Sequence, residues 1–111
     1  MRAISHPITA QLSLPGVLHA LSDPVRLEIV RALARGDELA CGALGAPVSK
    51  STLSHHLKVL RDAGLTQTRA EGVHRFVSLR SGDVEARFPG LLGCVLEHSG
   101  CAESGLGIPL I

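Results

Sequence analysis

Two different apolar periods meet at Gly64, and this change constrains the fold more than any other feature of the chain. Before it, Leu53, Leu57 and Leu60 recur at helical spacing, which predicts an amphipathic helix over about residues 49–63. After it, the pattern alternates with a period of two. The alternating residues are Thr66, Thr68 and Ala70, then His74, Phe76, Ser78 and Leu79, on either side of Glu71-Gly72-Val73. The sequence therefore predicts a helix followed directly by a β-hairpin.

Two helices are predicted upstream of this pair of elements. The first covers about residues 15–21, because Pro15 fits the first turn of a helix. The second starts at Ser22-Asp23-Pro24, where a side-chain oxygen can cap free amides. In the second helix Ile29, Val30 and Leu33 are expected to face inward, and Arg26 is expected to face outward.

A third, short helix is predicted over Glu38–Leu44, followed by a turn at Gly45-Ala46-Pro47. This short helix would precede the helix of residues 49–63, and the sequence therefore predicts two helices that are joined by a tight turn. A last helix starts near Ser81-Gly82-Asp83, and Pro89 is expected to kink or split it. The fold class is therefore mainly α with a small β-hairpin, a winged helix-turn-helix of about five helices and a two-stranded wing.

The length and composition favour one small domain. A chain of 111 residues builds one core, and we expect an N-terminal arm over 1–14, the domain over 15–98 and a flexible tail over 99–111. Two Phe residues, with no Trp or Tyr, offer no platform for base stacking. We recognise neither an apolar span for a bilayer nor a signal-peptide core, so a cytoplasmic protein without a membrane partner is expected.

Positive charge is concentrated in the helix and hairpin described above. Residues 48–80 hold six of the basic residues and two of the acidic ones, whereas the rest of the chain holds five basic and eight acidic residues. Such segregation focuses positive potential on one surface, where it attracts phosphates. Because the net charge of the whole chain is only +1, this local excess is hidden in the total.

The polar face of the predicted helix fits the major groove of DNA. A helix that approaches base edges needs small hydrogen-bonding side chains at its start and cations further along for phosphates. The hairpin adds cations that can follow the backbone into a minor groove. The predicted DNA-binding residues are Ser49, Lys50, Ser51, Thr52, Ser54, His55, His56, Lys58, Arg61, Arg69, His74 and Arg75.

Two other interpretations fit these residues. The polar face of a helix is often merely solvated, and a winged helix can serve as a protein-interaction module without binding DNA. We find no glycine-rich phosphate cradle, nucleophile triad or carboxylate cluster, so an enzyme is not expected.

Two segments resemble the ArsR family of bacterial repressors. They are residues 21–30, LSDPVRLEIV, and residues 51–65, STLSHHLKVLRDAGL. The similarity covers about residues 16–97. The resemblance implies that the Ser-His-His-Leu segment lies on the recognition helix, that the hairpin is the wing and that the first and last helices form a homodimer interface.

The apolar residues agree with that implied dimer, because they exceed what one small core needs. A two-fold dimer would place two recognition helices about one helical turn apart, which predicts a partly palindromic operator in double-stranded DNA. The residues expected at the dimer interface are Val17, Leu18, Leu21, Leu91, Leu92, Val95 and Leu96.

The cysteines leave the question of an effector open. Many members of the family release DNA on binding a transition metal or a metalloid, or on thiol oxidation, but Cys41 is a single thiol between the two positions that the family's arsenic sensors use. Cys94, His98 and Cys101 would share a face of a continuous helix and are candidate metal ligands or a redox pair. The alternative is that Cys94 is a small buried hydrophobe and Cys101 lies in a loose tail. No cofactor is assigned.

Overall fold

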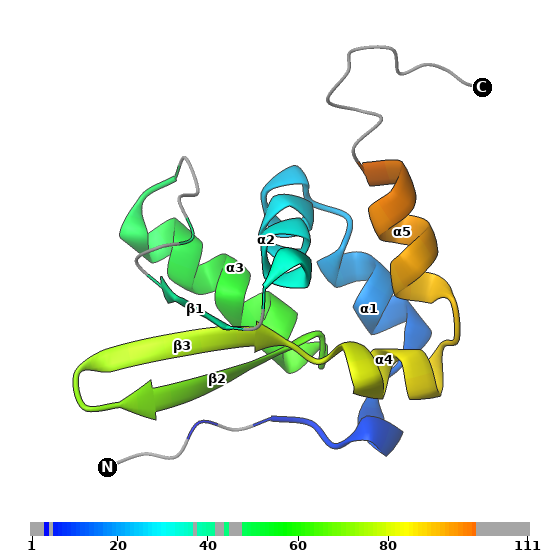
Figure 1. Ribbon diagram of the computed structural model, residues 1–111, viewed down its shortest axis with the longest axis horizontal. Coiled ribbons are helices and arrows are strands. Elements are labelled where there is room, and N and C mark those ends of the chain that lie inside the picture. The colour runs from blue at the N-terminus through cyan, green and yellow to red at the C-terminus, as the bar shows by residue number, and fades with distance from the viewer. Residues whose placement is uncertain (1–3, 5, 37, 42–43, 45–47, 100–111) are drawn as a thin grey trace.

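The computed structural model describes residues 4, 6–36, 38–41, 44 and 48–99 as helices around a small antiparallel sheet (Figure 1). Helices α1, α2 and α3 lie on one side of the sheet, and the hairpin projects beyond them. The elements are a 3-10 turn η1 (Thr9–Gln11), α1 (Leu14–Ala20), α2 (Pro24–Arg35), β1 (Glu38–Ala40), α3 (Lys50–Asp62), β2 (Thr66–Glu71), β3 (His74–Leu79), α4 (Ser81–Arg87) and α5 (Leu91–Ser99).

A side-chain cap precedes each of the first three helices, as the sequence predicted for α2 and α3. Ser13 accepts a hydrogen bond from the Gly16 amide, Asp23 accepts from the amides of α2's first turn, and Ser49 accepts from the Thr52 amide. Each bond satisfies a backbone donor that has no partner within its helix. Pro15 and Pro24 occupy first turns, where their missing amide hydrogens are not needed.

The sheet has one strand more than the sequence predicted. Strands β2 and β3 pair from Thr66↔Leu79 to Glu71↔His74, which confirms the hairpin, and Gly72 adopts a φ of 63° at its tip. However, Glu38–Ala40 is not the start of a helix: it forms β1 and pairs with Ser78, Val77 and Phe76. The edge of β3 opposite β2 has backbone N–H and C=O groups that need hydrogen-bond partners. Pairing with that edge stabilises Glu38–Ala40 as a strand more than its weak helical pattern stabilises a helix. Residues 42–43 and 45–47 of the predicted helix and turn lie outside the described residues.

The N-terminal segment is packed against the domain. Leu12 is buried in the same core as Val17, Leu33, Leu60 and Val77. Its flanks are held by hydrogen bonds from Arg87 Nε to the Leu12 carbonyl, 3.0 Å, and from Arg80 Nη1 to the Pro7 carbonyl, 2.7 Å. Within the expected N-terminal arm of residues 1–14, the described stretch 7–12 therefore contributes Leu12 to the core and supports α4.

One contact of this segment predicts pH-dependent stability. His6 Nε2 accepts a hydrogen bond from the Thr68 amide of β2, 3.0 Å away, and burial, followed by the nearby charges of Arg61 and Arg80, lowers the pKa of His6. An unfolded chain takes up this proton near pH 6.5, whereas the folded chain resists it, so stability should fall as pH drops below that value.

The variant His6→Gln tests this expectation, because a glutamine amide oxygen can accept the same bond without titrating. Denaturant unfolding at pH 7.5 and pH 5.5 should show a larger loss of unfolding free energy for the wild-type protein than for the variant. Equal losses would contradict the role given to His6.

Gly64 is held in a conformation that other residues adopt at a cost. It lies between α3 and β2 with a φ of 87°, and a Cβ built there would stand 2.5 Å from Leu12 Cδ1. Gly64→Ala is expected to lower the unfolding free energy by about 2 to 4 kcal/mol, from backbone strain and overpacking. The matched control is Gly82→Ala, where a Cβ meets nothing within 4 Å. Equal unfolding free energies for the two variants would contradict this account of Gly64.

The last helical region is divided, as Pro89 predicted. Helix α4 ends at Arg87, and α5 begins at Leu91 after Gly90, whose φ is 84°. Ser99 is the last residue of α5, and residues 100–111 lie outside the described residues, so the expected tail is not described beyond it. No helix within the described ranges is both long and apolar enough to cross a bilayer.

Candidate nucleic-acid interface

The start of α3 presents small polar side chains to solvent. Ser49 caps the helix, and its hydroxyl also lies 3.0 Å from Thr52 Oγ1, so these two residues are partly engaged with each other. Ser51, Ser54 and His55 are exposed. Hydroxyl and imidazole groups at such positions can donate to or accept from base edges.

A groove runs between α3 and the hairpin. Two adjoining hollows of about 380 and 340 Å³ share Cys41, Ser54, Leu57 and Arg75. Among the described residues that line them, the charged or titratable side chains other than the Cys41 thiol are all basic: Lys50, Lys58, Arg61, His74 and Arg75. A concave surface with cations and no carboxylate suits a phosphate backbone.

The cations of the groove differ in their ion pairing and in their exposure to solvent. Lys58 Nζ lies 2.7 Å from Asp62 Oδ2, and Arg61 is half-buried, with an Nε atom that has no hydrogen-bond partner. In contrast, Lys50 and Arg75 are exposed at either side of the groove, and no ion pair involves them in the described part of the chain. We therefore expect Lys50 and Arg75 to contact phosphates more easily than Lys58 and Arg61 do.

Arg69 is already engaged within the sheet. Its guanidinium makes two hydrogen bonds to Glu38 of β1, 2.9 and 3.2 Å, and one to Glu71, 2.9 Å, and lies over the Phe76 ring. The hydrogen bonds to Glu38 and then Glu71 raise the pKa of Arg69. This residue was predicted to contact DNA, but the structure uses it to join β1 to β2, so we leave it out of the proposed interface.

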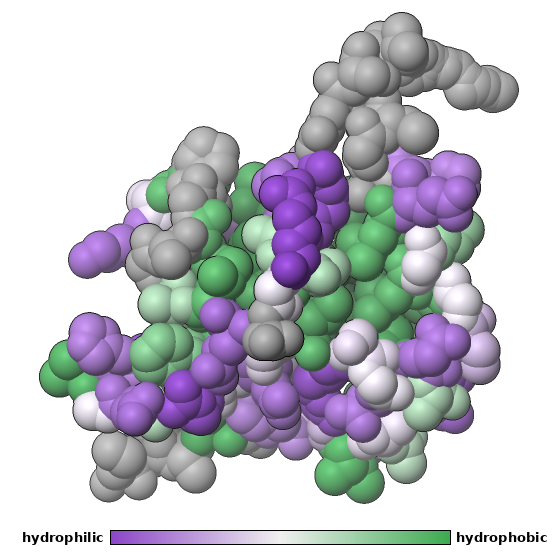
Figure 2. Space-filling view, viewed as in Figure 1, coloured by the Kyte–Doolittle hydropathy of each residue, from purple (hydrophilic) through white to green (hydrophobic). Residues whose placement is uncertain are grey.

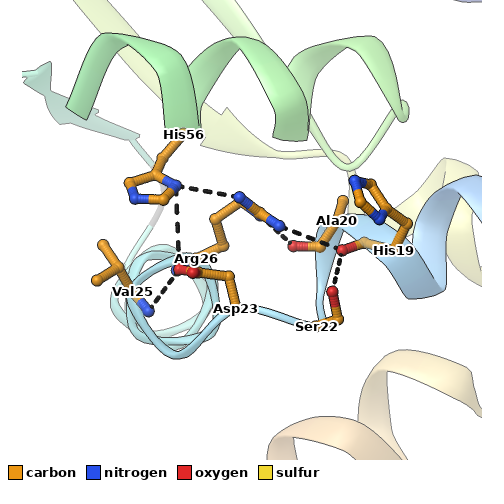
Figure 3. Close-up of polar contacts among 7 residues, drawn as sticks. All are labelled: His19, Ala20, Ser22, Asp23, Val25, Arg26 and His56. Carbon is orange, nitrogen blue, oxygen red and sulfur yellow. Dashed lines mark hydrogen bonds and ion pairs between the residues drawn. The ribbon is translucent and has the colours of Figure 1, made fainter. Parts of the chain in front are cut away.

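His56 and Arg26 correct two expectations. Both residues are 8% exposed, so Arg26 does not face solvent and His56 does not lie on the outer face of α3. Arg26 Nη1 lies 3.1 Å from His56 Nδ1 in the junction between α2 and α3 (Figure 3). Of the adjacent histidines, His55 is therefore the exposed one, and the proposed interface leaves His56 out.

The residues expected at a dimer interface divide into two groups. Val17, Leu21 and Leu92 are buried within the single chain, so they belong to its own core and are not surplus. Leu18 is 46% exposed, and Leu91, Val95 and Leu96 are half-buried. Leu14, which was not among the residues expected at the interface, is 44% exposed on α1. Figure 2 shows the apolar surface that gathers over α1 and α5.

The thiols do not assemble a metal site in the described residues. Cys94 and His98 are exposed on α5, and Cys101 lies outside the described residues. No group of three or more His, Cys, Asp or Glu residues that could hold an ion occurs in the described ranges. Cys41 is half-buried in the groove, where burial, partly offset by Arg75, raises the pKa of its thiol. The raised pKa favours the protonated thiol, which is the less reactive form.

Comparisons with known proteins identify the family. Residues 21–69 match a family described as a helix-turn-helix domain. The chain is 44% identical to the uncharacterised HTH-type transcriptional regulator YceK of Bacillus subtilis, over 68% of this chain and 79% of that protein. It is also 34% identical to the arsenical resistance operon repressor of the same organism, over 73% of this chain and 79% of that protein. The chain belongs to the ArsR family.

The solved structures agree with this assignment. The homodimeric winged helix-turn-helix DNA-binding domain of Mb0332 from Mycobacterium bovis, a possible ArsR-family transcriptional regulator, superimposes with a TM-score of 0.62. It is 27% identical and covers 87% of both chains. The predicted resemblance to the ArsR family and the winged helix-turn-helix fold are confirmed. Members of this family are DNA-binding transcriptional regulators and not enzymes.

Proposed function

We propose that this ArsR-family protein is a homodimeric repressor that binds a partly palindromic operator in the cytoplasm, with α3 in the major groove and the hairpin on the adjacent backbone or minor groove. The observation that carries this proposal is the groove between α3 and the hairpin, where the described lining residues include five basic side chains and no carboxylate. The exposed Ser51, Ser54 and His55 stand beside that groove and supply groups that can read bases.

The apolar surface over α1 and α5 supports the dimer. Leu14 and Leu18 are 44% and 46% exposed, and a two-fold contact would bury both residues on each of the two protomers. In such a dimer two copies of α3 face the same side of a duplex, about 34 Å apart. The proposal assigns no metal or metalloid, because the potential ligands on α5, Cys94, Glu97 and His98, belong to no group within the described residues that could hold an ion.

Hydroxyl-radical footprinting on the duplex upstream of the chain's own gene tests this arrangement. We expect two protected half-sites whose centres lie about 10 base pairs apart, related by an approximate two-fold axis. A uniform cleavage pattern would contradict operator binding and favour a winged helix that binds another protein. A single protected half-site would contradict the dimer.

A further inference from the structure

Three helices meet at one buried guanidinium. Arg26 extends from the first turn of α2 into the junction with α1 and α3, as Figure 3 shows. Its Nε donates to the Ala20 carbonyl, 2.7 Å, and its Nη2 donates to the His19 carbonyl, 3.3 Å, both at the end of α1. Its Nη1 lies 3.1 Å from Nδ1 of His56 on α3. One side chain therefore links the end of α1 to the middle of the recognition helix.

The chemistry of this junction determines which ring nitrogen of His56 acts as the acceptor. A guanidinium can only donate hydrogen bonds, so Nδ1 of His56 must present its lone pair to Arg26, and a neutral ring then carries its proton on Nε2. The carbonyls at the end of α1 are groups that a helix cannot satisfy internally, and they favour a cation. Asp23 completes the junction: it caps α2, and its Oδ2 lies 3.9 Å from His56 Nδ1.

The apolar contacts of α3 constrain its rotation less strictly than a directional hydrogen bond does. Leu57 and Leu60 bury α3 against the core, but hydrophobic contact is non-directional and tolerates small shifts. A hydrogen bond from a buried guanidinium is directional, and leaving either partner without the other in a buried site is unfavourable. The bond between Arg26 and His56 therefore restricts where α3 can sit on α2.

We propose that Arg26 and His56 are positioning residues for DNA recognition, which set the rotation and depth of α3 relative to α1 and α2. This inference rests on the proposed DNA binding. His56 is the neighbour of the exposed His55 and lies two residues from Ser54 and from Lys58, so a rotation of α3 moves the whole reading face. Because α1 also carries Leu14 and Leu18, the same junction sets the distance between the two copies of α3 in the dimer.

Two substitutions of His56 separate positioning from burial. In His56→Asn the side-chain oxygen stands at the same number of bonds from the backbone as Nδ1 and can accept from Arg26. In His56→Leu the volume is similar but the acceptor is lost. We expect the Leu variant to bind the footprinted operator about 10- to 100-fold more weakly than the wild-type protein, and the Asn variant to stay within about 3-fold of it.

A double substitution tests whether the two residues act together. Arg26→Leu should weaken operator binding. The fold-loss of affinity in the double variant, Arg26→Leu with His56→Leu, should be much smaller than the product of the two single fold-losses. Binding to a random duplex, which depends on phosphate contacts, should change less than binding to the operator in all of these variants.

Stability must be controlled, because removing a buried polar partner also destabilises the fold. Val84→Ala is the control: it opens a cavity in α4, away from α3, and should lower the unfolding free energy without changing operator affinity. All affinities are measured at a temperature where each variant is folded and dimeric.

The outcomes distinguish this inference from the proposed function. A Leu variant that binds like the wild-type protein, or an Asn variant that loses as much as the Leu variant, would overturn the positioning role while DNA binding stands. A loss in Val84→Ala equal to that in His56→Leu would overturn it as well, because general destabilisation would then explain both. A wild-type protein that does not prefer the operator would remove the proposed function and this inference together.

Discussion

Replacing Lys50 or Arg75 with glutamate is expected to weaken operator binding by about 100-fold or more, because each change removes a phosphate contact and adds repulsion at both copies of the site. These two residues are exposed on opposite sides of the groove between α3 and the hairpin. Neither is engaged in an ion pair within the described ranges, so their charges are available to DNA. Secondary structure and unfolding free energy should stay close to the wild-type values, since neither side chain contributes to the core.

Affinity measured against salt concentration checks this prediction. The plot of log affinity against log salt should become shallower by about 2 for each substitution, one lost phosphate contact per protomer. Arg35→Glu is the matched control: it makes the same change of charge on an exposed residue at the end of α2, outside the lining of the groove. An equal loss for Arg35→Glu would show that net charge, and not the groove, governs binding.

Leu18→Glu should convert the dimer to a monomer and weaken operator binding by about 100-fold or more, because two half-sites must then be bound independently. Leu18 lies on the apolar surface of α1 and α5, and at a two-fold interface each copy of the change brings an unpaired carboxylate into an apolar contact. In the monomer the side chain is half exposed, so the fold itself should tolerate glutamate.

Sedimentation or light scattering measures the oligomeric state, and anisotropy measures the affinity. Ile8→Glu is the control, because Ile8 is a large exposed apolar side chain that lies outside α1 and α5. It should leave both the mass and the affinity unchanged. A Leu18→Glu protein that remains dimeric and binds the operator tightly would place the dimer contact elsewhere.

Strong local signals explain what the sequence predicted correctly. The leucine spacing of α3, its cap at Ser49 and the alternation after Gly64 each specify a conformation within a short segment. Pro89 likewise marked the break between α4 and α5. These elements were confirmed because residue propensity, apolar periodicity and the capping or helix-breaking residues at their ends indicated the same structure.

Strand β1 could not be predicted in the same way. Glu38–Ala40 is three residues long, too short for a period to be distinguished, and it becomes a strand because β3 offers it a free edge. Such pairing depends on a segment almost forty residues away in the chain, and Arg69 strengthens it by bonding to Glu38. Long-range pairing of this kind leaves little trace in local sequence.

The sequence does indicate that Arg26 and His56 are buried, through their positions on the apolar stripes of their helices. Their polarity concealed this indication. Arg26 stands three, four and seven residues before Ile29, Val30 and Leu33, and so lies on their buried stripe. His56 stands four residues before the buried Leu60. Helical position predicted burial for both, whereas their polarity suggested solvent or DNA. Polar residues on an apolar stripe are therefore candidates for internal hydrogen-bonded positions.

The most direct test of the central claim is the affinity of the reduced, metal-free protein for the duplex upstream of its own gene, measured over a range of salt concentrations beside a random duplex. The account predicts two chains per duplex, a steep decrease of affinity with salt, and binding to the upstream duplex at least about 1,000-fold tighter than to the random one. Equal, weak binding to both duplexes would contradict it.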